Sequence, residues 1–92
     1  MSKYTLEEER IMESKKIIEL IQSDDWKERL KGEFYELEDR IEKLYDMLDK
    51  WDKGKLNFTP TSDRKLYNEQ LSTMVTLRSI LGLRAKEASI EL

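Results

Sequence analysis

The sequence predicts an all-α fold of three helices, in which a short N-terminal helix packs on a long antiparallel helical hairpin. Three observations predict this. One proline and three glycines leave few places where a helix has to break. An apolar heptad pattern runs through the middle of the chain, as in helices that pair along a seam. Charged residues make up 40% of the sequence and supply the solvated outer faces of long helices. We expect a single domain over residues 1–92.

The first helix is expected over residues 6–22. Thr5 and Glu8 have the spacing of a capping box, in which the threonine side chain accepts from the backbone amide three residues later. Glutamates in the first turn suit the positive end of the helix dipole. The apolar stripe of this helix consists of Ile11, Ile17, Ile18 and Ile21.

The second helix, expected over residues 25–52, carries the strongest periodic signal in the chain. Good N-cap residues precede it at 23–25, and Gly54 is a plausible stop. Its apolar residues follow at alternating spacings of four and three, which is the a/d pattern of a coiled coil. They are Leu30, Phe34, Leu37, Ile41, Leu44, Leu48 and Trp51.

A loop over residues 53–61 leads to the third helix, expected over residues 62–90, with Thr61, Ser62 or Asp63 as its N-cap. Gly82 would let a neighbouring helix approach closely. The inner face is predicted to hold Leu66, Tyr67, Leu71, Met74, Leu77, Leu81 and Ala88, widened by Ile80 and Leu83.

Opposite charge favours pairing of the second and third helices. Residues 24–52 hold eleven acidic and six basic side chains, whereas residues 63–92 hold four acidic and five basic side chains. An antiparallel hairpin is expected to place Arg84 near Glu33 and Arg78 near Glu36.

The first helix is too short to cover the whole hairpin, so the loop end is predicted to stay uncovered and to form a homo-oligomer interface. The alternative is that the first two helices fuse into one rod. Such a rod could not bury its apolar stripe alone, so it would depend on a dimer partner even more strongly. The interface residues are predicted to be Tyr45, Trp51, Leu56, Phe58 and Leu66.

Composition excludes several chemistries. The chain has no cysteine and no histidine, which removes thiolate and imidazole catalysis and most zinc sites. We therefore expect no enzyme, metal or cofactor. A net charge of −3 with dispersed basic residues argues against direct nucleic-acid binding. No apolar run is long enough to span a membrane, so a cytoplasmic location is expected.

Arginines beside the apolar seam are the candidate ligand-binding residues. Arg40, Arg78 and Arg84 could hold phosphate, and Tyr67 could stack on a base. The alternative is that these arginines pair with Glu33, Glu36 or a neighbouring subunit.

Two segments carry a family resemblance. The chain resembles small helical phage proteins related to a crAss-like phage protein. The residues are Arg29, Leu30, Glu33, Phe34, Glu36, Leu37, Arg40, Ile41, Lys43 and Leu44, followed by Gln70, Leu71, Met74, Ile80, Leu81 and Arg84. In size and architecture it is also similar to the anti-CBASS and anti-Thoeris sponges, which sequester nucleotide immune signals.

The resemblance implies a counter-defence protein encoded by a phage and active in the host cytosol. It would act stoichiometrically, as an oligomeric sponge for a cyclic nucleotide. Two other functions stay open: an acidic inhibitor of a host defence or nucleic-acid-binding protein, and a coiled-coil assembly module without a ligand.

Overall fold

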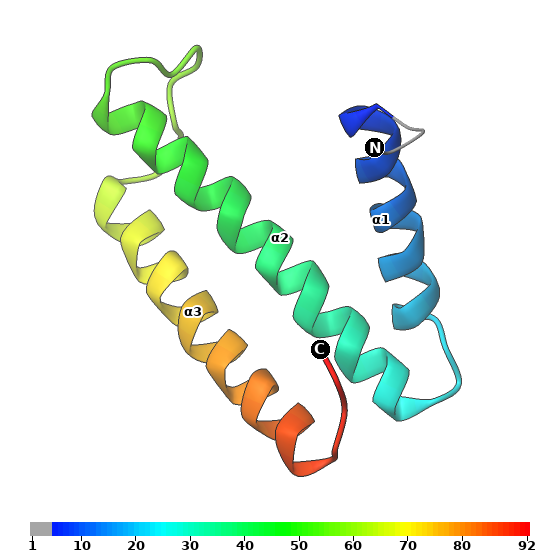
Figure 1. Ribbon diagram of the computed structural model, residues 1–92. Helices are drawn as coiled ribbons and strands as arrows, with labels where there is room; N and C mark the ends of the chain where they lie inside the picture. The colour runs from blue at the N-terminus through cyan, green and yellow to red at the C-terminus, as the bar shows by residue number, and fades with distance from the viewer. Residues whose placement is uncertain (1–4) are drawn as a thin grey trace.

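The computed structural model describes residues 5–92, without the side chains of residues 10–12. Three helices form this part of the chain: α1 (Leu6–Ile21), α2 (Trp26–Asp52) and α3 (Arg64–Glu87). Helices α2 and α3 run antiparallel, and α1 folds back along the other side of α2 (Figure 1). The all-α prediction is confirmed, and α1 and α2 are separate helices instead of one rod.

Each helix begins at a side-chain cap that the sequence indicated. The hydroxyl of Thr5 accepts from the amide of Glu8 at 3.1 Å, and its own proton goes to the Glu8 carboxylate. Asp25 accepts from the Lys27 amide at 2.9 Å, and Asp63 from the Lys65 amide at 3.3 Å. These bonds satisfy amides that the first turn of a helix leaves without a partner.

The seam between α2 and α3 holds the core. The heptad positions of α2 are all buried or half-buried, as predicted from their spacing. Across the seam Leu81 is only 2% exposed, and Ala85 is buried beside it. The core cluster consists of Leu30, Leu37, Ile41, Leu81 and Ala85, with Phe34, Leu71, Met74 and Ile90 packed against it.

The inner face of α3 differs from the predicted one. Leu66 and Leu77, expected inside, are exposed, and Ile80 and Leu83 are exposed as well. The reason is the register. The inward-facing residues form an unbroken four-three heptad that includes Arg78 and Ala85, two residues that a search for large apolar side chains passes over. This heptad consists of Tyr67, Leu71, Met74, Arg78, Leu81, Ala85 and Ala88.

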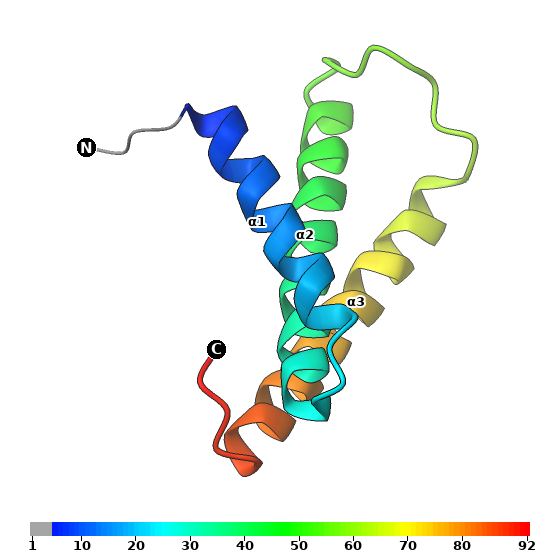
Figure 2. The same cartoon turned by 90° about the vertical axis from the view of Figure 1, so that its right-hand side faces the viewer.

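Helix α1 meets α2 at a crossing instead of a seam. A Cβ atom on the buried Gly32 would lie 2.8 Å from the Cβ of Leu20 and 2.9 Å from the backbone nitrogen of Ile21. From this crossing α1 diverges toward its N-terminus, as Figure 2 shows. Ile17 and Leu20 lie on the face of α1 toward α2 and are half-buried, whereas Ile18 lies off that face and is exposed. The side chain of Ile11 lies outside the described residues.

The glycine that permits close helix packing is Gly32, not Gly82 as the sequence suggested. A Cβ at Gly82 would meet only the Cε2 atom of Phe34 at 3.7 Å, an ordinary contact. An alanine would fit there without displacing α2.

Helices α2 and α3 end in the same hydrogen-bonding motif. The amide of Gly54 donates to the Trp51 carbonyl, and the amide of Lys55 donates to the Lys50 carbonyl. This is a Schellman motif, with Gly54 in the left-handed conformation at φ 67°.

Helix α3 closes in the same way, so it ends at Glu87 rather than at residue 90. The amide of Ser89 donates to Lys86, and that of Ile90 donates to Ala85. Ser89 takes the left-handed position at φ 57°, where a side chain is strained. The turn carries Ile90 back onto the core.

The predicted charge pairs across the hairpin do not form. Among the described residues, no ion pair joins Arg84 to Glu33 or Arg78 to Glu36. Glu36 instead accepts two hydrogen bonds from Arg40, one turn away on α2, at 2.8 and 3.1 Å. A partner one turn away on the same helix is within reach whatever the register of the hairpin.

Candidate functional site

An open groove of about 540 Å³ runs along one edge of the α2–α3 seam. Its lining combines apolar side chains with charged ones. The α2 side supplies two carboxylates and a tyrosine, and the α3 side supplies one arginine. The lining residues are Glu38, Ile41, Glu42, Tyr45, Leu71, Val75 and Arg78.

Arg78 is the distinctive residue of this groove. It is half-buried at a heptad position of the α3 seam, where the neighbouring positions are Met74 and Leu81. Its side chain makes no ion pair with any described residue. An arginine at such a position can bury its aliphatic stem while directing its guanidinium toward the groove mouth. It therefore offers five N–H donors at the edge of an apolar surface.

The other predicted ligand residues do not line this groove. Arg40 is exposed and bound to Glu36. Arg84 is exposed, near the end of α3. Tyr67 is half-buried and packs edge-on against Trp51, with ring centroids 5.9 Å apart. A single protomer does not unite the four predicted residues in one groove.

At the loop end, Trp51 and Tyr67 belong to a cluster that holds α3 to α2. The guanidinium of Arg64 lies 5.4 Å from the centre of the Trp51 ring and donates two hydrogen bonds to the Asp52 carboxylate. These bonds lower the pKa of Asp52, against a smaller opposing effect of desolvation, and raise the pKa of Arg64. Trp51 therefore packs within its own protomer, although the sequence predicted it to lie in an interface between subunits.

What remains exposed at the loop end is a smaller apolar patch than predicted. Tyr45, Phe58 and Leu66 are exposed, whereas Trp51 and Leu56 are half-buried. Tyr45 also lines the groove beside Arg78, a position that the sequence pattern did not predict.

A comparison with protein families identifies the hairpin. The family model described as Sequestin matches residues 24–87. The chain belongs to the Sequestin family. The matched residues cover all of α2 and α3 and leave out α1. No curated protein and no solved structure matches the chain. The Arg78 groove therefore lies entirely within the Sequestin part.

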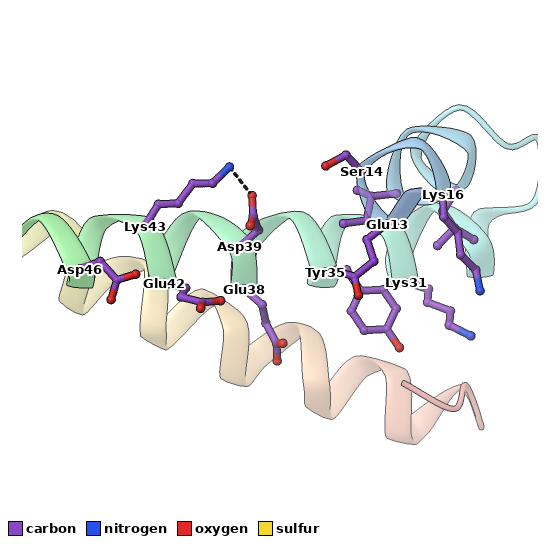
Figure 3. A pocket seen from close by; sticks show the side chains of 12 residues that line it. Glu13, Ser14, Lys16, Lys31, Tyr35, Glu38, Asp39, Glu42, Lys43 and Asp46 are labelled. Atoms are coloured by element: carbon purple, nitrogen blue, oxygen red, sulfur yellow. Dashed lines mark ion pairs between the residues drawn. The ribbon is translucent and has the colours of Figure 1, made fainter. Parts of the chain in front are cut away.

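A second groove, of about 670 Å³, separates α1 from α2 where the two helices diverge. Figure 3 shows its charged lining. Five carboxylates and three lysines surround it, and Lys43 is paired with Asp39 at 2.8 Å. The carboxylates are those of Glu13, Glu38, Asp39, Glu42 and Asp46. This groove is net acidic and needs α1, so it is only partly a Sequestin feature.

Within residues 5–92, no group of three or more carboxylates is arranged to hold a metal ion. None of the three helices is long and apolar enough to cross a membrane.

Proposed function

We propose that this chain acts by stoichiometric binding and not by catalysis, as a phage-encoded counter-defence protein that sequesters a nucleotide immune signal. The Sequestin name is consistent with a sequestering role. The Arg78 groove is the proposed binding site.

The observation that carries the proposal is Arg78 itself. At its heptad position an apolar side chain would pack against α2 at no electrostatic cost, whereas a half-buried guanidinium without an ion pair has a desolvation penalty. A bound phosphate would remove that penalty, because a guanidinium binds phosphate through two parallel N–H···O bonds.

The remaining lining suits the other parts of a nucleotide. The Tyr45 side chain is 61% exposed and offers a face for a base. Glu38 and Glu42 can accept hydrogen bonds from ribose hydroxyls, as carboxylates do in dinucleotide sites. A volume of about 540 Å³ lies within the range of small-molecule sites.

The groove is open on its outer side, so one protomer would leave much of a bound nucleotide in water. The proposal therefore includes an oligomer, in which a second subunit covers the ligand. Arg40, Arg84 and Tyr67 lie outside the groove of their own protomer, so they would contact the ligand only if the second subunit brought them to it.

Isothermal titration calorimetry against a panel of cyclic and linear nucleotides tests the proposal. We expect heat with at least one cyclic nucleotide, and its loss in Arg78→Gln. Lys65→Gln removes the same charge from an exposed site on the same helix and should bind as the wild type does. No heat with any nucleotide, from protein shown to be folded and oligomeric, would overturn the proposal.

Arg78→Leu separates a ligand role from a structural one. If the arginine is there for a ligand, leucine should abolish binding while raising the free energy of unfolding, because it removes a desolvated charge from the seam. A variant that unfolds more easily than the wild type would show instead that Arg78 supports the fold.

The acidic α1–α2 groove favours a second candidate, an inhibitor that docks on a basic host protein. Five carboxylates against three lysines attract a positively charged surface. Capture of a host protein that is released as salt concentration rises would support this candidate. Salt-insensitive capture would exclude charge as its basis.

A further inference from the structure

Helix α3 has a second apolar stripe outside the face that packs against α2. Leu66, Leu77, Ile80 and Leu83 are 57%, 41%, 48% and 62% exposed. Helix α1 contacts α2 but makes no contact with α3, so no described element of the protomer covers this stripe. At four positions on a single helix, this is more than the scattered apolar exposure of an ordinary surface.

Three residues of this stripe, Leu66, Leu77 and Ile80, share a heptad register of their own, and Leu83 lies outside it. Residues 66, 70, 73, 77, 80 and 84 follow at spacings of four and three, one position before the heptad that faces α2. We call these six positions the outer seam. Its centre, Leu77 and Ile80, is apolar, and so is Leu66 at one end, whereas Gln70, Thr73 and Arg84 are polar. A partner helix would thus be held mainly by the apolar centre, with polar residues beside it.

The charges beside the outer seam specify the direction of the partner helix. Glu69 lies before the apolar centre and Arg84 after it, and neither makes an ion pair with a described residue. In an antiparallel pair of α3 helices, Leu77 lies opposite Ile80 of the second copy. Arg84 then lies opposite Thr73 of that copy, one turn from its Glu69. The two-fold axis forms this charge pair twice, whereas a parallel pair would bring the two Arg84 side chains together.

We propose that two copies of this chain dimerise by antiparallel packing of their outer seams. Helix α3 has 24 residues, or about 36 Å at the usual rise of an α-helix. That length, with flanking side chains, suits a contact near the usual size of about 800 Å² on each partner. The dimer would be a four-helix arrangement of α2 and α3 from each copy. The Arg78 groove uses other residues of α3, so a subunit that covers a ligand there would have to join through a second contact.

This interface differs from the loop-end interface expected from the sequence, and the two can be tested against each other. Ile80→Lys and Phe58→Lys each put one positive charge at an exposed apolar residue, the first in the outer seam and the second in the loop. Sedimentation equilibrium over a range of protein concentrations should show wild-type dimers. Ile80→Lys should weaken the dimer at least tenfold, whereas Phe58→Lys should leave it unchanged. A monomeric wild type, or a dimer that only Phe58→Lys breaks, would overturn the proposal.

A charge reversal tests the antiparallel register. Glu69→Arg and Arg84→Glu should each weaken the dimer, because each puts like charges within reach across the axis. The double variant restores opposite charges in both symmetric pairs and should regain wild-type association. If both single changes and the double change leave the dissociation constant unaltered, the register is wrong. The measurement needs no nucleotide. A dimer that forms through another face would leave the Arg78 proposal standing, whereas a monomeric wild type would also remove the second subunit that this proposal requires. Failed nucleotide binding would leave the dimer standing.

Discussion

Helix α2 packs against two neighbours in different ways. Its contact with α3 is a seam in which heptad side chains are buried along the whole helix. Its contact with α1 concentrates at Gly32, where no side chain separates the two backbones, and then opens into a groove. A seam distributes its energy over many side chains, whereas a crossing depends on a few atoms. Four predictions test this difference, from the largest expected effect to the smallest.

The seam should be most sensitive at its most buried side chain. We expect Leu81→Ala to lower the free energy of unfolding by about 2–5 kcal/mol, because it leaves a cavity among residues of both helices. Leu83→Ala on the exposed face is the control and should change it by less than about 0.5 kcal/mol. Urea denaturation measures both. Equal effects would contradict the observed register of α3.

The crossing should be sensitive at a residue without a side chain. Gly32→Ala should destabilise by about 1–3 kcal/mol, because its Cβ would overlap Leu20 and the Ile21 backbone. This outweighs the gain of about 1 kcal/mol that alanine normally gives in a helix. Hydrogen exchange should localise the loss to α1.

Gly82→Ala is the matched control for that change. Its Cβ would have room beside Phe34, so we expect a gain of up to about 1 kcal/mol. If Gly82→Ala destabilised the protein and Gly32→Ala did not, the close approach would lie at the seam and not at the crossing.

The matching turns after α2 and α3 give a third prediction. Ser89→Gly should stabilise by about 1 kcal/mol and Gly54→Ala should destabilise by about as much, because both positions are left-handed. Thermal unfolding should show opposite shifts of the midpoint. Shifts of the same sign would contradict the shared motif.

The smallest effect concerns acid. Because Arg64 lowers the pKa of Asp52 in the folded protein, the pair stabilises the fold above the ordinary aspartate value of 3.8. That contribution disappears as the pH falls through the lowered pKa. Asp52→Asn should therefore cost stability at neutral pH, with the difference from the wild type shrinking toward low pH. Asp46→Asn, which removes an exposed carboxylate without an ion pair among the described residues, should show no such convergence.

The seam was predictable from sequence because it repeats. Seven apolar positions in α2 indicated one buried face, and the caps at Thr5, Asp25 and Asp63 marked each helix start. The family resemblance and the family match fall on the same hairpin.

The crossing and the site were harder to predict because neither depends on residues that recur at a regular spacing in the sequence. A glycine in a helix gives no sign of whether a neighbour touches it, so Gly32 went unnoticed and Gly82 was chosen instead. The sequence indicated Arg78 as a candidate ligand residue. It did not indicate that Arg78 lies inside the seam, because the predicted inner face of α3 included Leu66 and Leu77. Reading Arg78 and Ala85 as heptad members would have given the observed register.

Glu38 and Glu42 line both the Arg78 groove and the acidic groove beside α1. Their charge is therefore common to the two cavities. A cation held in the α1 groove would neutralise part of this shared wall and strengthen the hold of Arg78 on an anion. By thermodynamic reciprocity, the anion would strengthen the hold on the cation by the same factor. Two ligands of opposite charge would thus bind cooperatively on opposite sides of one helix turn, without any movement of the backbone.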